Sequence, residues 1–196
     1  GFAGEVSSVS HTASIIGNGV TILTACQRDQ NAQEASGQGI FTRMLMDGLS
    51  GGSADILGRI TPASVYSHID QTLGSWEQRP VYKANVQNFV TLRTIPPKIA
   101  PETLRNLPTY FKSDTDLFML DPSYEPDRKN IPIKFRKLPT DPDHIRVFKE
   151  LQACNRQGLV VPVDVEHMYD AAINSKSCRL TALGSHYRRL AELKRI

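Results

Sequence analysis

The sequence predicts an α/β domain joined to a second, smaller α+β module. A short apolar, β-branched run at 19–26 is typical of a buried strand in a parallel sheet, and two segments with helical spacing of apolar residues follow it. The charge also changes along the chain. Residues 1–96 hold six basic and seven acidic side chains, whereas residues 97–196 hold 17 and 13. This shift favours two modules with different surfaces.

The composition narrows the class of protein. The 196 residues, 40% of them hydrophobic, suffice for one large domain or two small ones with a sizeable core. No apolar run approaches the roughly 20 residues of a membrane helix, and no signal-peptide layout opens the sequence. The three cysteines (Cys26, Cys154 and Cys178) are widely spaced, which disfavours a disulfide scaffold or a zinc site. We therefore expect a cytoplasmic protein with no membrane segment, metal or cofactor.

The first module, residues 1–95, opens with a small, polar loop that leads into the strand at 19–26. The polar segment 27–38 separates this strand from a helix that we expect over 40–49, stopped by the glycine pair that begins at Gly51.

A second helix is marked by Thr61 as its cap and Pro62 in its first position, and its apolar stripe continues to Gly74. Two short strand-like runs follow, at 81–83 and 89–93. Strand, helix, helix and strand in this order indicate a layered α/β domain.

Residues 96–140 are rich in proline and predict a connector with one short helix near 101–111. Beyond it, the third segment, residues 141–196, changes character. We expect a helix, two short strands and a second helix there, over residues 144–156, 158–162, 167–172 and 180–190. This order within about 55 residues resembles a winged-helix module.

Cys26 is a candidate nucleophile, with His11 as its candidate base. Cys26 ends the predicted strand, and open α/β sheets place ligands beyond the carboxyl ends of their strands. In the alternative reading, Cys26 is a small buried residue and His11 a loop histidine. Cys154 and Cys178 lie in the basic module, where core or surface thiols are the simpler interpretation.

Asp29 and Glu34 lie in the polar segment just beyond the same strand end. Two carboxylates in a cleft can bind a cationic side chain through charge-assisted hydrogen bonds. Two carboxylates on a solvated loop are the alternative, and composition does not separate the two hypotheses.

These segments resemble the small subunit of caspase-like cysteine proteases, most closely metacaspases, paracaspases and the bacterial caspase-family proteins. The resemblance starts in the strand and acidic loop and continues over nearly the whole chain. It rests on Thr24–Gln27, Asp29–Glu34, Gly39–Thr42, Gly58–Thr61, Tyr66–Asp70, Gln78–Lys83, Leu120–Glu125 and Leu180–Gly184.

The resemblance implies a caspase-like layered sheet and a cysteine endopeptidase that works by thiolate attack and acyl transfer. The family's dyad is a His in a His-Gly context and a Cys in a Cys-His-Ser-Gly-like segment. Neither a His-Gly nor a Cys-His pair occurs here. We therefore expect no catalytic residue within this chain and a Cys/His dyad on a preceding large-subunit portion, with Gly1 as the glycine that closes the nucleophile motif.

The resemblance also gives the acidic loop a role. Caspases that accept aspartate use an arginine in this loop, and the best-matching position here is Glu34, with Asp29 nearby. A carboxylate reverses the sign of the pocket. The implied substrates are therefore proteins cleaved after Arg or Lys, bound by Cys26, Asp29 and Glu34.

The basic tail has two readings. Arg188, Arg189, Lys194 and Arg195 cluster on or after the last predicted helix, where they could contact DNA phosphates. The macrodipole also favours cations there, so a protein-protein module is the preferred reading and a nucleic-acid partner is not favoured. A non-catalytic caspase-fold adaptor, or a DNA-binding module acting through the tail, remains the alternative to the peptidase.

Overall fold

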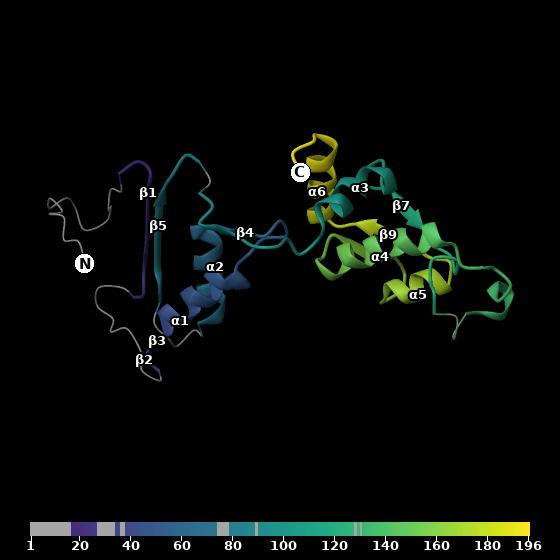
Figure 1. Ribbon diagram of the computed structural model, residues 1–196, viewed down its shortest axis with the longest axis horizontal. Helices are drawn as coiled ribbons and strands as arrows, with labels where there is room; N and C mark the ends of the chain where they lie inside the picture. Colours follow the sequence, from purple (N-terminus) through teal and green to yellow (C-terminus); the bar gives the residue numbers. More distant parts are fainter. Residues whose placement is uncertain are drawn as a thin grey trace. The chain divides into compact units, whose positions relative to one another are not determined.

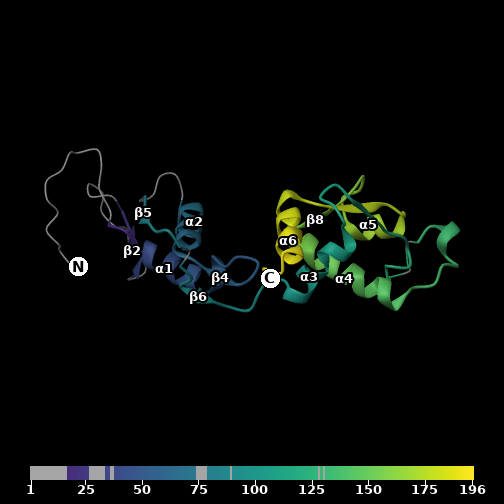
Figure 2. The same ribbon diagram turned by 90° about the horizontal axis from the view of Figure 1, so that it is seen from above.

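The computed structural model describes residues 17–26, 34–35, 38–73, 79–88, 90–127, 129 and 131–196. The chain separates into two compact units, Gly1–Pro96 (unit 1) and Pro97–Ile196 (unit 2), and each is described by itself. Figures 1 and 2 show the helices and strands of both units as ribbons. Each unit combines α-helices with small antiparallel sheets, so the broad α/β class predicted from the sequence is confirmed.

The described residues of unit 1 form two α-helices and three two-stranded antiparallel sheets. β1 pairs with β5, β2 with β3, and β4 with β6. The elements are β1 (Val20–Thr24), β2 (Glu34–Ala35), β3 (Gln38–Gly39), α1 (Ile40–Asp47), β4 (Arg59–Ile60), α2 (Pro62–Thr72), β5 (Val81–Asn85) and β6 (Arg93–Thr94).

The strand predicted at 19–26 forms as β1, but its surroundings differ from the prediction. It pairs antiparallel with β5, with Val20 opposite Asn85 and Thr24 opposite Val81 (Figure 1). The expectation of a parallel sheet is therefore wrong for this strand. An apolar, β-branched run indicates that a strand forms, whereas the direction of its partner depends on how the chain returns after α2.

Burial along β1 alternates, so the strand is not buried on both faces as expected. Thr21 and Leu23 are half buried, whereas Val20 and Ile22 point outward and are 40% and 41% exposed. Alternation with period 2 is what a strand shows when only one face of its sheet is covered. The second apolar face of β1 has no cover from the described residues of unit 1.

α2 begins where the sequence predicts. The Ser64 N–H donates to Thr61 Oγ1 over 3.1 Å, the Thr61 N–H donates to Ser64 Oγ over 3.0 Å, and Pro62 occupies the first helical position. These two bonds form a capping box, which satisfies backbone donors that a helix start otherwise leaves unpaired. The predicted cap is confirmed.

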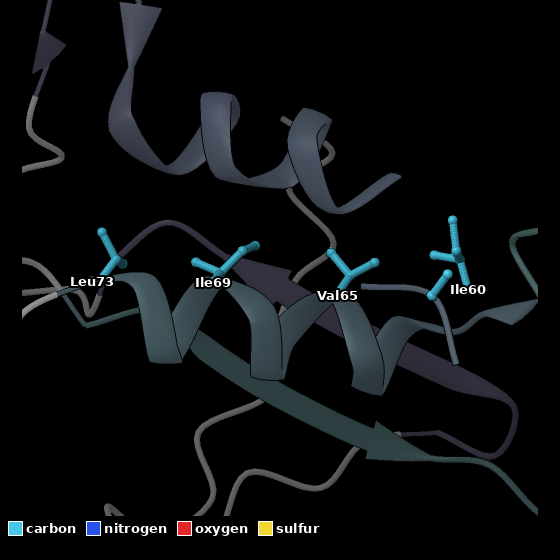
Figure 3. Packing of buried hydrophobic residues seen from close by; sticks show 5 residues of the cluster. Ile60, Val65, Ile69 and Leu73 are labelled. Atoms are coloured by element: carbon cyan, nitrogen blue, oxygen red, sulfur yellow. The ribbon is translucent and has the colours of Figure 1, made fainter. Parts of the chain in front are cut away.

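The core of unit 1 lies between α2 and α1. Val65, Ile69 and Leu73 follow one another at helical spacing along the side of α2 that faces α1, and Ile60 of β4 continues the row (Figure 3). Ile60, Val65 and Ile69 are fully buried. Partly buried apolar side chains complete the cluster: Leu23, Ile40, Phe41, Met44, Leu45, Leu49 and Ile95.

Two boundaries in unit 1 differ from the sequence prediction. α1 ends at Asp47, and a π-helical turn over Gly48–Gly52 follows, in which Gly51 has a φ of 139° that favours glycine. The strand expected over 89–93 forms only at β6, which pairs with β4, and residue 89 lies outside the described residues.

The described residues of unit 2 form four α-helices and one three-stranded antiparallel sheet with the strand order β7-β9-β8. A short 3₁₀ turn lies at Ile133–Phe135. The other elements are α3 (Pro101–Tyr110), β7 (Leu117–Met119), α4 (Pro142–Arg156), β8 (Val160–Pro162), α5 (Met168–Ile173), β9 (Ser177–Leu180) and α6 (Ala182–Glu192).

The proline-rich segment 96–140 supplies more structure to unit 2 than its composition indicates. It contributes α3, close to the expected short helix, and β7, which pairs with β9. Phe118 of β7 contacts the rings of Tyr110, Phe111 and Tyr124 at centroid distances of 5.8–6.0 Å. These aromatic contacts hold β7 to the rest of unit 2.

The strand expected at 167–172 is wrong, because these residues belong to α5. The buried side chains Met168, Ala171 and Ala172 recur at helical spacing rather than at every second position. The last helix also starts later than expected. Thr181 is its N-cap, and Leu180 instead ends β9.

Within the described ranges, no helix combines the length and apolar character needed to cross a bilayer.

Gly184 gives a direct test of packing in unit 2. A β-carbon at this position in α6 would lie 2.0 Å from the backbone carbonyl oxygen of Leu159, and a backbone atom cannot rotate away. We expect Gly184→Ala to lower the free energy of unfolding by about 1–3 kcal/mol, the usual cost of overpacking. The matched control Ser185→Ala should stay within about 0.5 kcal/mol. Hydrogen exchange of the β9 and α6 amides measures both, and equal exchange in the two variants would contradict this packing.

Candidate functional site

The predicted substrate-binding residues lie at and beyond the carboxyl end of β1. Cys26 is half buried there, and the Thr24 hydroxyl donates to the Cys26 carbonyl oxygen over 3.2 Å. Glu34 forms part of β2, with its backbone opposite Gly39 of β3. Asp29, His11 and the side chain of Glu34 lie outside the described residues. The arrangement of the two carboxylates around Cys26 therefore stays a prediction.

The β2–β3 hairpin sets where the polar segment 27–38 ends. Gly39 is both the last residue of β3 and the N-cap of α1, so the hairpin leads into the helix without a connecting loop. Ile40 and Phe41 then pack against the core of unit 1. The described residues on either side of the segment thus belong to β1 and to α1.

Cys154 of α4 and Cys178 of β9 are core residues rather than nucleophiles. Both are buried, and burial raises the pKa of each thiol to about 12. A thiol with such a pKa stays protonated near neutral pH, whereas the thiolate is the reactive form.

The inner face of the β1–β5 ladder carries a small apolar cavity. Tyr82 of β5 stacks on Tyr66 of α2, with ring centroids 5.1 Å apart. Beside Tyr82, a cavity of about 90 Å³ is lined by Thr21, the first turn of α2 and residues 86–90 that the structure describes. The lining extends from Tyr82, opposite Leu23, to residues beyond the end of β5, and Cys26 is not part of it.

His68 and Asp47 form a pair that the sequence analysis missed. His68 Nε2 lies 2.7 Å from Asp47 Oδ2 and links α2 to the end of α1. Gly52 fits against both side chains, because a β-carbon there would stand 2.8 Å from Asp47 Oδ2. The two residues are 21 positions apart, and no sequence signal links them. The adjacent polar hollow, of about 210 Å³, is lined by serine hydroxyls that already bond within the unit, such as Ser53 to the Gly48 carbonyl.

Unit 2 contains a serine, a histidine and an aspartate in mutual contact. Ser123 Oγ lies 2.6 Å from His144 Nδ1 and donates to Asp121 Oδ1 over 2.5 Å. A hydroxyl has one proton, and a carboxylate only accepts, so His144 Nδ1 carries the hydrogen that Ser123 Oγ accepts. A nucleophilic serine needs the opposite arrangement, with its proton directed at the imidazole. The cluster is therefore a structural clamp between α4 and the turn after β7.

Comparison with known proteins gives no assignment: no family model matches the chain, and neither a curated protein nor a solved structure matches it.

Removal of the Ser123 hydroxyl should destabilise unit 2, because this hydroxyl joins α4 to the turn after β7. Ser123 is 5% exposed, and Ser123→Ala removes its hydroxyl bonds to the half-buried Asp121 and His144, so it should lower the free energy of unfolding by about 0.5–1.5 kcal/mol. Thr140→Ala, an exposed position in the same unit, is the control. Thermal unfolding of the 196-residue chain checks both, and unchanged melting of Ser123→Ala would contradict the clamp.

Proposed function

We propose that this chain is the C-terminal part of a caspase-like cysteine endopeptidase that cleaves proteins after Arg or Lys. The Cys/His dyad lies on a preceding large-subunit portion, and unit 1 supplies the wall of the cleft and its acidic loop. Unit 2 is an accessory, winged-helix-like module that binds a protein regulator. The proposal includes a cytoplasmic location and no cofactor.

The open face of the β1–β5 ladder is the observation that carries this proposal. Val20 and Ile22 are apolar and exposed on the outer face of β1, one of the two five-residue strands described in unit 1, with Lys83 of β5 opposite Ile22. A two-stranded ladder is marginal by itself, and a sheet needs further strands or a second layer to bury such a face. A large-subunit portion that adds strands and helices would supply both.

The positions of the family-like motifs support the same proposal. Cys26 lies just beyond the carboxyl end of β1, which the family resemblance makes the strand-end wall of the cleft. In this proposal Asp29 and Glu34, from the segment between β1 and α1, give the pocket a negative charge suited to a cationic side chain.

The basic tail fits a protein contact better than DNA. Arg188 is 8% exposed and directs its guanidinium inward, donating to Asp114 Oδ1 over 3.1 Å and to the Lys112 carbonyl oxygen over 3.2 Å. Glu192 lies 3.5 Å away on the same helix. One of the four clustered cations therefore holds α6 to the loop between α3 and β7 and does not face a phosphate backbone.

Charge removal in the acidic loop tests the specificity. With the preceding portion restored, the enzyme should cleave fluorogenic peptides ending in Arg or Lys and ignore those ending in Asp. Glu34→Gln keeps the shape but removes the charge, and it should lower kcat/KM for Arg peptides on the order of 10–10³-fold. Glu102→Gln, an exposed carboxylate in unit 2, is the control and should change nothing. If Glu34→Gln cleaves Arg peptides as fast as the wild type, Glu34 does not recognise the cationic side chain. A wild-type preference for Asp peptides would contradict the proposed acidic pocket.

A second prediction addresses the open sheet face. Ile22 is exposed and lies opposite Lys83, so Ile22→Lys adds a like-charge pair and should lower the stability of this chain alone by no more than about 1 kcal/mol. If a large-subunit portion covers that face, the same lysine should abolish association, since a buried unpaired charge costs several kcal/mol. Co-purification of the two portions measures this, with Leu183→Lys on α6 as the control. Normal association of Ile22→Lys would rule out this face as the contact.

A further inference from the structure

Strand β7 leaves one edge of the unit 2 sheet without a described partner. The Leu120 N–H donates to the Lys176 carbonyl oxygen over 2.9 Å, which fixes the hydrogen-bonded register between β7 and β9. In an antiparallel pair, inward and outward backbone groups alternate along the strand. The N–H and C=O groups of Leu117 and Met119 therefore point away from β9. Among the described residues, none bonds to these groups.

The side chains along this edge are apolar and exposed. Leu117 and Met119 are 54% and 63% exposed on the outer face of the sheet, whereas Phe118 points inward to its aromatic neighbours. Sheet edges that must stay unpaired are usually very short or carry charged residues, proline or a bulge. β7 is short, but none of its three residues is charged or a proline.

An arginine stands on the same outer face. Arg179 of β9 lies directly opposite Leu117 on one side and Val161 of β8 on the other. Arg179 is exposed, and within the part of the chain that the structure describes it makes no ion pair. The acidic side chains before β7 are already engaged: Asp114 pairs with Arg188, and Asp116 accepts from the backbone N–H groups of Lys112 and Ser113.

We infer that the free edge of β7 binds an extended peptide strand whose outward side chains are apolar with one central carboxylate. Backbone pairing to Leu117 and Met119 supplies affinity, as in other strand additions, and the apolar side chains cover those two residues. A strand added to β7 lies two strand spacings, about 9–10 Å, from β9. An arginine side chain is long enough that Arg179, extended over Leu117, would reach a glutamate on that strand. This inference is independent of the proposed peptidase activity.

The test uses the 196-residue chain and a fluorescein-labelled heptapeptide, Thr-Val-Thr-Glu-Thr-Val-Thr, followed by fluorescence polarisation. We expect a Kd on the order of 10–100 µM, as for a small interface. In an antiparallel pair the Val and Glu residues lie opposite Leu117 and Met119, and their N–H groups face β7. The peptide with Lys in place of Glu, and one with N-methylated Val and Glu residues, should each bind at least about tenfold more weakly.

Variants of the chain locate the contact. Arg179→Glu should weaken binding of the Glu peptide at least about tenfold and strengthen binding of the Lys peptide. A loss of folded protein would weaken the binding of both peptides, so it cannot produce this exchange of preference. Leu117→Glu, which places a like charge beside the peptide glutamate, should also weaken binding, whereas Leu183→Glu on α6 should not. Binding that ignores the peptide charge, or that Arg179→Glu leaves unchanged, overturns the inference. Self-association of the chain that Leu117→Glu abolishes would assign the edge to a second copy and overturn it as well.

Discussion

Unit 1 depends on the packing of a single helix. α2 presents Val65, Ile69 and Leu73 to α1 and presents Tyr66 to the inner face of the β1–β5 ladder. An amphipathic helix gains most of its stability from such burial, since helix propensity alone leaves short helices marginal. Because α2 covers only one face of the ladder, the side chains of Val20 and Ile22 on the other face contact solvent in this chain, where a further layer of structure would bury them. The proposed function follows from this one-sided cover.

Unit 2 is held together by polar clamps as well as by its core. Arg188 joins α6 to the loop before β7, and Ser123 with His144 joins α4 to the turn after it. Tyr110 of α3 donates to Glu150 of α4 over 2.8 Å, and burial followed by this bond raises the pKa of the phenol to about 12. Charged and titratable groups that suggest chemistry in the sequence thus serve packing in this unit.

Local patterns in the sequence predicted some elements and failed for others. The Thr61-Pro62 start of α2 is a local signal, because the cap bonds join residues three apart, and the structure confirms it. The sheet around β1 depends on a partner about 60 residues later, which no local pattern encodes. The apolar pattern of residues 167–172 is too short to distinguish a helix from a strand, and in the structure Met168–Ile173 form α5. The pairs His68–Asp47 and Ser123–His144 come from tertiary packing alone. Of the candidate site, the sequence placed Cys26 at a strand end correctly, while the roles of Asp29 and Glu34 rest on the family resemblance.

The central claim is that β1 is one strand of a larger sheet completed by a preceding portion of the same protease. Amide hydrogen exchange of Val20–Thr24 tests this most directly, in the 196-residue chain alone and in the chain produced together with that portion. In the isolated chain every second amide of β1 points away from β5 and should exchange rapidly. In the complete protein we expect these amides to exchange at least about tenfold more slowly, because they become paired and covered. Equal exchange of β1 in the two forms would contradict it.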